Sequence, residues 1–293
     1  MGKRKFYVVD VFAEKKYAGN QLAVVRNAKF LSKETMQRIA REMNFSETTF
    51  ILTDEKKGGG YDVRIFTPKK EVPFAGHPTL GTAFIIIQRE IAKECVKEIV
   101  LNLKVGKIPL SFSYRGKDAD ILWMKQMKPT FGKILNPSRI AQILNLDLED
   151  LDTGFPVQEV STGLPFIIVP LRTLRALKQC RLNKEKFFEL IKETEAKLIL
   201  IFAPETYNSQ NHLNVRVFAD YVGVPEDPAT GSANGCLAGY LVNCRYFGRG
   251  RINIRVEQGY EIGRRSLLLL RAEEKDGNTD KKRILPQLSS LRP

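Results

Sequence analysis

The sequence has no long apolar segment. None of its apolar runs approaches the roughly 20 residues that a helix needs to cross a bilayer. The stretch from Phe6 to Phe12 follows the basic residues Lys3, Arg4 and Lys5, but it is too short for the hydrophobic region of a signal peptide. We therefore expect a cytoplasmic protein without a membrane partner.

Cysteine and histidine are scarce. The four cysteines, at positions 95, 180, 236 and 244, form no C-x-x-C pair, which argues against a disulfide framework and a zinc site, so we expect reduced thiols in the core. His77 and His212 are far apart and belong to no metal-ligand motif. The glycines at 58–60 are not followed by the Gly-Lys-Ser/Thr of a phosphate-binding loop. The sequence thus predicts neither a metal nor a cofactor.

An excess of positive charge does not by itself identify a partner. The 293 residues include 47 lysines and arginines against 33 aspartates and glutamates, a net charge of +14. These positive residues are spread along the chain without interleaved aromatics, so we interpret them as a solvated basic surface and do not expect dedicated nucleic-acid binding. With 43% hydrophobic and 27% charged residues, the composition is that of a globular protein whose length favours two domains.

Local patterns predict the same kinds of element in both halves of the chain. Thr79 to Gln88 is apolar on nearly every side, so this helix must be surrounded by protein, and we expect sheets to wrap around it. The strand pattern breaks at Lys128 to Gly132, where we place the boundary between domains of residues 1–127 and 128–293. The predicted strands are 6–12, 21–25, 48–52, 61–66, 99–103, 108–114, 121–124, 166–169, 198–202 and 214–218, and the other helices are 32–43, 138–144 and 184–192.

An internal repeat relates the two halves. Val63-Arg64-Ile65-Phe66 recurs 152 positions later as Val215-Arg216-Val217-Phe218, and Val72-Pro73 recurs at the same separation as Val224-Pro225. After a slip of two residues, His77-Pro78-Thr79-Leu80-Gly81-Thr82-Ala83 matches Asp227-Pro228-Ala229-Thr230-Gly231-Ser232-Ala233. Such an ordered set of matches is hardly a product of chance and predicts two similar folding units.

Each copy of the repeat is typical of a strand, a turn and a helix that begins at Pro78 or Pro228. On this interpretation His77 and Asp227 are helix N-caps, beside amides that lack a partner within the helix and attract anions. Pseudo-twofold symmetry would bring both helix starts to a cleft between the domains. The alternative for Asp227 is a purely structural cap, and we expect His212 to be a solvated surface residue.

Five blocks of sequence resemble the PhzF family of phenazine-biosynthesis proteins, whose members share the diaminopimelate epimerase fold. The blocks follow the family's order over almost the full chain. They are Asp10-Val11-Phe12 with Gly19-Asn20-Gln21-Leu22-Ala23-Val24-Val25; Asn44-Phe45-Ser46-Glu47-Thr48-Thr49-Phe50; Phe66-Thr67-Pro68 through Phe74-Ala75-Gly76-His77 to Ala83; Glu226-Asp227-Pro228 to Ala233; and Gln258-Gly259 with Gly263-Arg264.

The resemblance implies an α+β protein of two pseudo-symmetric domains, each a β-barrel-like sheet wrapped around a central helix, with a ligand between them and a homodimer as a common assembly. It implies a cofactor-independent isomerase of the type that acts on trans-2,3-dihydro-3-hydroxyanthranilate, a small carboxylate-bearing diene. Glu47 matches the glutamate that moves a proton between ring carbons, and His77 and Asp227 match residues that assist it. The matching substrate-binding positions are Asn20, Gly76, Gly231 and Ser232.

Elementary chemistry is compatible with these roles. One group must act first as base and then as acid, so its pKa should lie nearer neutrality than the usual ~4.3 of glutamate. Burial of Glu47 would raise its pKa, and Phe45 and Phe50 are candidates for the apolar walls. Without the family pattern, the ordinary interpretation of Glu47 is a surface-facing strand residue.

The chain departs from the family pattern at Gln21, at Asp220 and at Arg265, where proline is usual, and these changes bear on the substrate more than on the fold. The ending, Ile284 to Leu291, lacks the Gly-Gly-containing final strands of the family, which predicts an altered or disordered last hairpin. Two other functions stay open. One is an amino-acid epimerase or racemase with two thiols facing the substrate, for which only Cys236 is near a motif. The other is a non-catalytic protein on the same fold that binds a small molecule or an anion or acts as a scaffold.

Overall fold

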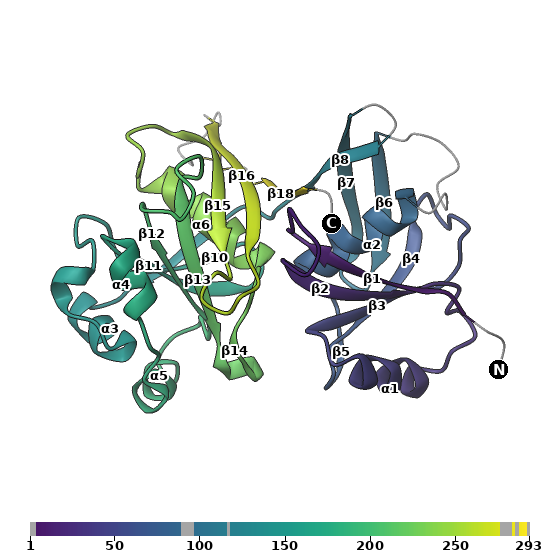
Figure 1. Cartoon of the computed structure of the whole chain (residues 1–293), viewed down its shortest axis with the longest axis horizontal. Helices are drawn as coiled ribbons and strands as arrows, with labels where there is room; N and C mark the ends of the chain where they lie inside the picture. Colours follow the sequence, from purple (N-terminus) through teal and green to yellow (C-terminus); the bar gives the residue numbers. More distant parts are fainter. Residues whose placement is uncertain (1–3, 89–96, 116–117, 276–282, 285–286, 292–293) are drawn as a thin grey trace. The chain divides into compact units, whose positions relative to one another are not determined.

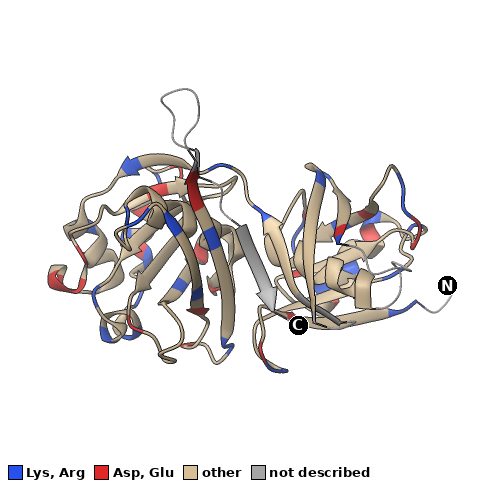
Figure 2. Cartoon of the chain, turned by 90° about the horizontal axis from the view of Figure 1, so that it is seen from above, with Lys and Arg blue, Asp and Glu red and all other residues tan. Residues whose placement is uncertain are grey.

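The computed structural model describes residues 4–88, 97–115, 118–275, 283–284 and 287–291, which form two compact units (Figure 1). The first unit comprises residues 1–124 with 289–293, and the second comprises residues 125–288. The predicted domain limits placed the last residues in the second domain, whereas residues 289–291 group with the first unit, where β18 (Gln287–Leu291) pairs with β8 (Asp118–Lys125). Lysine and arginine are scattered over both units (Figure 2). No helix in the described ranges is long and apolar enough to cross a membrane.

The first unit is one curled sheet with a helix at its centre. The strands pair in the order β1, β2, β3, β4, β6, β7 and β8, with β2–β3 and β4–β6 parallel and the other neighbours antiparallel, and β5 pairs with β4. The elements are β1 (Phe6–Val11), β2 (Asn20–Val25), α1 (Lys33–Met43), β3 (Glu47–Ile51), β4 (Tyr61–Phe66), β5 (Glu71–Val72), α2 (Gly76–Gln88), β6 (Glu98–Leu103), β7 (Gly106–Arg115) and β8.

The central helix α2 packs against β1, β2, β3 and β6, which confirms the prediction of a helix surrounded by sheet. Its residues from His77 to Ala83 are all buried. A Cβ at Gly81 would lie 2.6 Å from Leu22 Cδ2 and 2.8 Å from Val11 Cγ2, so the small residue lets the helix and the sheet approach closely.

The two faces of β3 serve different partners because side chains alternate along a strand. Phe50 lies in the cluster beneath α1 and meets Phe66 edge to face, with ring centroids 5.4 Å apart. Thr49 points the other way and exchanges a hydrogen bond with Thr82 of α2 at 2.8 Å. Glu47 has the same parity as Thr49 and therefore belongs to the face that meets α2. Phe50 is thus not an apolar wall of Glu47.

The second unit repeats this arrangement with additional helices. Its strands pair in the order β9, β10, β11, β12, β13, β15 and β16, with β11–β12 and β13–β15 parallel, and β14 pairs with β13. The elements are β9 (Thr130–Ile134), α3 (Pro137–Leu144), the 3-10 turn η1 (Leu148–Asp150), β10 (Gln158–Ser161), β11 (Pro165–Pro170), α4 (Leu174–Gln179), α5 (Lys184–Leu190), β12 (Ile199–Ala203), β13 (Leu213–Ala219), η2 (Asp220–Val222), β14 (Val224–Glu226), α6 (Gly231–Asn243), β15 (Arg251–Gln258), β16 (Ser266–Lys275) and β17 (Arg283–Ile284).

Two layers cover the two faces of this second sheet. Ile199 and Ile201 pack against α3, α4 and α5, while Phe202 faces α6 and meets Tyr240 with ring centroids 6.0 Å apart. A Cβ at Gly239 of α6 would lie 2.8 Å from Pro129 Cβ, another close approach of the central helix. Of the predicted ending, Ile284 belongs to β17 and residues 287–291 form β18, whereas residues 285–286 lie outside the described residues.

The pairing pattern confirms the internal repeat. From β1 to β7 and again from β10 to β16, the main strands alternate antiparallel, parallel, antiparallel, parallel and antiparallel pairings. The repeated arginine also keeps its contact. Arg64 binds Glu71 of β5 through two hydrogen bonds of 2.8 and 2.9 Å, and Arg216 binds Glu226 of β14 at 3.0 and 2.8 Å. The repeat therefore duplicates an arginine clamp as well as a strand order.

Candidate functional site

In the first unit, three elements begin at the same edge of the sheet. Because β2 and β3 are parallel, with Leu22 opposite Glu47, their first residues lie near one another. The first turn of α2 reaches this edge, and the imidazole of His77 makes a hydrogen bond to the backbone of Gln21. The edge thus carries Asn20, which is 2% exposed, together with Glu47 and His77.

Glu47 and His77 form a close pair at this edge. Glu47 Oε2 lies 3.4 Å from His77 Nε2, and the side chains are 18% and 7% exposed. Burial lowers the pKa of His77 from 6.5 to about 3, while the bond to the Gln21 backbone opposes that shift. The imidazole is therefore neutral at neutral pH. Glu47, at the head of β3 and facing α2, is a partly enclosed carboxyl group and not a surface-facing strand residue.

The hydrogen bonds of His77 define its tautomer. The Gln21 bond raises the pKa of His77, as a bond to a carbonyl acceptor does, and Nε2 makes no hydrogen bond of its own among the described residues. The bond to Gln21 therefore comes from Nδ1–H. A neutral imidazole carries one N–H, so Nε2 presents its lone pair to Glu47. Nε2 can therefore accept a hydrogen bond from a donor on that side.

The predicted role of His77 as a helix N-cap is wrong. The helix α2 begins at Gly76, two residues before the predicted start at Pro78, and the carbonyl of Ala75 accepts hydrogen bonds from the Thr79 amide at 3.3 Å and from the Thr79 hydroxyl at 2.7 Å. Proline fits anywhere in the first turn, because none of the first four amides has a partner within the helix. Pro78 therefore marks the first turn and does not fix its first residue.

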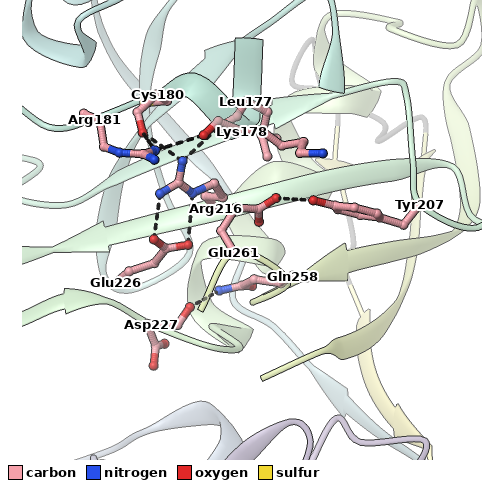
Figure 3. Close-up of polar contacts among 10 residues, drawn as sticks. All are labelled: Leu177, Lys178, Cys180, Arg181, Tyr207, Arg216, Glu226, Asp227, Gln258 and Glu261. Atoms are coloured by element: carbon pink, nitrogen blue, oxygen red, sulfur yellow. Dashed lines mark hydrogen bonds and ion pairs between the residues drawn. The ribbon is translucent and has the colours of Figure 1, made fainter. Parts of the chain in front are cut away.

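The predicted role of Asp227 as an N-cap is also wrong, for a different reason. The helix α6 begins at Gly231 with Thr230 as its N-cap, so Asp227 and Pro228 belong to an irregular turn before it. Gln258 is fully buried at the end of β15, and its side chain forms hydrogen bonds with backbone groups of this turn that would otherwise bond within a helical turn. Gln258 Oε1 accepts from the Thr230 amide at 3.1 Å. Its Nε2 donates to the Asp227 carbonyl at 2.8 Å, as Figure 3 shows.

Further contacts hold the same turn. Ser266 Oγ donates to the Pro228 carbonyl at 2.8 Å, and a Cβ at Gly259, where φ is +76°, would lie 2.6 Å from that carbonyl. Only glycine accommodates both the left-handed conformation and the close approach. Asp227 itself is half-buried, and its Oδ2 accepts a hydrogen bond from Thr230 Oγ1 at 2.5 Å. The turn is thus fixed from β15, from β16 and from within.

The arginine clamp of the second unit anchors the strand that leads into Asp227. Arg216 is 5% exposed and also donates to the carbonyls of Leu177 at 2.8 Å and Cys180 at 2.9 Å, near the end of α4 (Figure 3). These bonds satisfy the buried guanidinium, and the Glu226 carboxylate raises the pKa of Arg216 against the effect of burial. Glu226, and with it the start of the Asp227 turn, is therefore tied to the helical layer.

The two units do not duplicate the acidic group. Phe66 pairs with Thr48 and Phe218 pairs with Ile199, so the residue that corresponds to Glu47 in the second unit is Leu198. Leu198 is 6% exposed. The carboxyl at the head of the third strand thus occurs in the first unit alone, although the repeated motif carries His77 in one unit and Asp227 in the other.

The remaining predicted site residues lie at the two helix starts. Gly76 is the first residue of α2, and Gly231 and Ser232 are the first two residues of α6. Each unit therefore brings its own predicted set together: Asn20, Glu47, Gly76 and His77 in the first, and Asp227, Gly231 and Ser232 in the second.

Sequence reasoning missed the supporting residues of both sets. Gln258 stands out in the sequence only as part of the Gln258-Gly259 block, because the strand that it ends, β15, is not among the predicted strands. Thr230 and the backbone of Gln21 gave no signal that separates them from ordinary residues. His212 is exposed as predicted, and its Nδ1 accepts from the Arg255 amide at 3.2 Å.

The described cysteines all belong to the second unit, whereas Glu47 and His77 belong to the first. Cys180 and Cys236 are buried and Cys244 is half-buried, in agreement with the expectation of core thiols, while Cys95 lies outside the described residues. Burial raises the pKa of Cys236 to about 11 and that of Cys180 to about 12. Neither thiol is prepared to act as a base near neutral pH.

Comparisons with known proteins give consistent results. A family model described as phenazine biosynthesis-like protein matches residues 9–285. A trans-2,3-dihydro-3-hydroxyanthranilate isomerase of Pseudomonas aeruginosa is 34% identical over 269 residues, which cover 92% of this chain and 90% of that protein. The crystal structure of a PhzF-family phenazine biosynthesis protein from Bacillus anthracis is similar with a TM-score of 0.88 at 28% identity, covering 99% of this chain and 97% of that one.

The fold extends to more distant structures. A probable proline racemase from Agrobacterium radiobacter is similar with a TM-score of 0.62 at 9% identity, and the match covers 99% of this chain and 90% of that one. At this identity the likeness concerns the fold alone.

Proposed function

The chain belongs to the family of phenazine biosynthesis-like proteins and is an isomerase, and from this premise we propose that it moves a proton between two carbon atoms of a small carboxylate-bearing molecule, with Glu47 as the acid/base. The relative from Pseudomonas aeruginosa is named for trans-2,3-dihydro-3-hydroxyanthranilate. A cyclic diene of this kind is the first substrate class to test.

The observation that carries the proposal is the pair of Glu47 and His77. A proton transfer between carbons needs a base that takes a proton from one carbon, can exchange it with water, and then, as the acid, gives a proton to another carbon. As a carboxylate, Glu47 takes the proton, and the resulting O–H then faces the lone pair of His77 Nε2, now 3.4 Å away. Catalytic hydrogen bonds are often long before substrate binds and tighten afterwards. The neutral imidazole places no second charge beside this carboxyl group.

The second unit contributes Asp227 and the start of α6 in this proposal. The first amides of α6, at Gly231 and Ser232, carry the partial positive charge of a helix N-terminus and suit a substrate carboxylate. Asp227 assists the proton transfer, as its correspondence to His77 in the repeat suggests. The absence of an acid at Leu198 supports a one-base mechanism, since the repeat supplies no second carboxyl group of the Glu47 type.

The thiol-dependent epimerase is the less favoured alternative. That chemistry requires two activated thiols facing the substrate. Cys236 lies on α6, exchanges a hydrogen bond with Thr162 at 3.5 Å, and has its pKa raised to about 11 by burial. These properties are those of a core thiol, so they favour the carboxyl-based reaction.

Exchange with deuterated water tests the proposal. Wild-type protein incubated with trans-2,3-dihydro-3-hydroxyanthranilate in deuterated water should isomerise it and introduce deuterium at the carbon that receives the proton, as followed by NMR. Glu47→Gln keeps the shape and removes the base, so turnover should fall by about 10²–10⁴-fold. Binding of 3-hydroxyanthranilate, an aromatic analogue, should change little by calorimetry.

Matched variants separate chemistry from folding. Glu47→Asp retains the carboxyl group and should keep part of the activity, and Glu71→Gln removes a carboxyl from the same unit outside the pair. Equal turnover in Glu47→Gln and wild type would remove Glu47 from the mechanism. Turnover by the wild type without deuterium uptake would contradict an exchangeable acid/base.

A further inference from the structure

Thr230 occupies the N-cap of α6 but its side chain does not cap the helix. A threonine at this position ordinarily accepts a hydrogen bond from an amide of the first turn. Here no such bond is present, although the backbone has the extended conformation of a cap, with φ −118° and ψ 96°. The hydroxyl instead lies 2.5 Å from Asp227 Oδ2 and 3.0 Å from Gln258 Nε2. A threonine that does not cap the helix it precedes indicates that its hydroxyl is needed for another contact.

The orientation of the Gln258 amide follows from its backbone partners. The Thr230 amide can only donate, so the atom 3.1 Å from it is Oε1, and the Asp227 carbonyl can only accept, so the atom 2.8 Å from it is Nε2. The remaining contact agrees, because Asn234 Nδ2 donates to Oε1 at 2.9 Å. The amide of Gln258 is therefore held in one orientation by four bonds.

This orientation determines the direction of the Thr230 hydroxyl. Gln258 Nε2 must donate to Thr230 Oγ1, which leaves the single hydroxyl hydrogen of Thr230 for Asp227 Oδ2. A separation of 2.5 Å is typical of a hydroxyl that donates to a charged carboxylate. The chain Gln258–Thr230–Asp227 thus runs in one direction, from the core to the carboxylate.

We infer that Thr230 and Gln258 are positioning residues that hold the Asp227 carboxylate in its reactive rotamer by a one-way chain of hydrogen bonds. The inference rests on the proposed function in that Asp227 takes part in the reaction. Gln258 belongs to β15 and Thr230 precedes α6, so the carboxylate is fixed to both the sheet and the central helix. All three side chains belong to the second unit, so the whole chain of hydrogen bonds lies within one folding unit.

Two substitutions at one position give the sharpest test. Thr230→Ser keeps the hydroxyl, whereas Thr230→Val has nearly the same shape and removes it. Crystal structures of both variants should show the Asp227 carboxylate in its present rotamer in Thr230→Ser and in a different one in Thr230→Val. With trans-2,3-dihydro-3-hydroxyanthranilate, kcat should fall roughly 10-fold or more in Thr230→Val, with KM within about twofold, and should recover in Thr230→Ser.

A matched control distinguishes positioning from general loosening of the turn. Ser266 bonds the same turn at the Pro228 carbonyl, so Ser266→Ala removes a hydroxyl contact without touching the Asp227 carboxylate. We expect a lower melting temperature with kcat near that of the wild type. A second route to the chain is Gln258→Glu, which when ionised offers only acceptors and should turn the Thr230 hydroxyl away from Asp227.

Each outcome bears on one statement. An unchanged Asp227 rotamer in Thr230→Val, or equal losses of kcat in Thr230→Val and Ser266→Ala, would overturn the positioning inference. Should Asp227→Asn retain full turnover, the catalytic role of Asp227 in the proposed function fails, while the crystal structures still decide the positioning. If Asp227→Asn and Thr230→Val both lose kcat and Thr230→Ser keeps it, both statements stand.

Discussion

Replacing His77 with glutamine should change how the stability of the first unit depends on pH. Burial lowers the pKa of His77 from 6.5 to about 3, so below pH 6.5 its imidazole is protonated in the unfolded chain but stays neutral in the folded state. Between pH 6.5 and about 3 the unfolded state therefore binds one more proton at this site. The folded unit loses stability as the pH falls through that window, and the variant lacks this loss.

The magnitude follows from the shift. One pH unit corresponds to about 1.4 kcal/mol for one proton, so the wild type should lose about 2 kcal/mol through His77 between pH 6.5 and 5. The whole shift corresponds to about 5 kcal/mol. The slope of the unfolding free energy against pH should thus be smaller in His77→Gln than in the wild type by nearly 1.4 kcal/mol per pH unit, the value for one proton. This difference in slope does not depend on how the substitution changes the unfolding free energy at pH 7.

The chain provides its own reporter and control for this measurement. Its single tryptophan, Trp123, lies on β8 of the first unit, so urea unfolding at pH 7, 6 and 5 can be followed in that unit by fluorescence. His212, the other histidine, is exposed and belongs to the second unit, so His212→Gln should leave the slope unchanged. If His77→Gln has the slope of the wild type, His77 is protonated without penalty. The Glu47 carboxylate at 3.4 Å would then compensate its charge, and the neutral imidazole of our mechanism would be refuted.

Two further predictions concern the structural clamps. Replacing Arg216 with leucine leaves the carboxylate of Glu226, which is 9% exposed, without its cation, and should lower the unfolding free energy of the second unit by about 3–5 kcal/mol. The side chain of Arg64 is 28% exposed, so Arg64→Leu should lower the unfolding free energy of the first unit by only about 1 kcal/mol. Hydrogen exchange measures the stability of both units, and equal losses would contradict the role of burial. Glu257→Gln should accelerate exchange at the amide of Asn208, which now donates to Glu257 Oε1 at 2.9 Å, by about 10-fold, and an unchanged rate would count against that bond.

Local pattern was sufficient for most of the elements. The strand over residues 61–66 has the predicted bounds, and α1 begins at the predicted Ser32 cap, whose hydroxyl accepts from the Thr35 amide at 3.2 Å. Periodicity and cap chemistry act within a few residues, so they can be read from one segment. The strand at 130–134 was missed because its short polar sequence resembles a linker. Its pairing with β10 stabilises the strand although the sequence has a low strand propensity.

The direction of individual side chains was not available from the sequence. Phe50 is as apolar as a wall of Glu47 should be, yet the alternation of β3 turns it toward Phe66 and α1. The pKa of His77 likewise depends on its enclosure, which no residue beside it in the sequence produces.

The amino-acid sequence by itself determined the duplicated architecture, the apolar central helix and the residues that stand at the two helix starts, because hydrophobic periodicity and repeated motifs record these directly. The tertiary structure decided where those helices begin and which atoms face one another. Gln258 is 28 positions from Thr230 and still sets the turn before α6, and Glu47 meets His77 across 30 positions. Such contacts arise from strand register and packing between segments distant in the chain, so a local pattern contains no record of them.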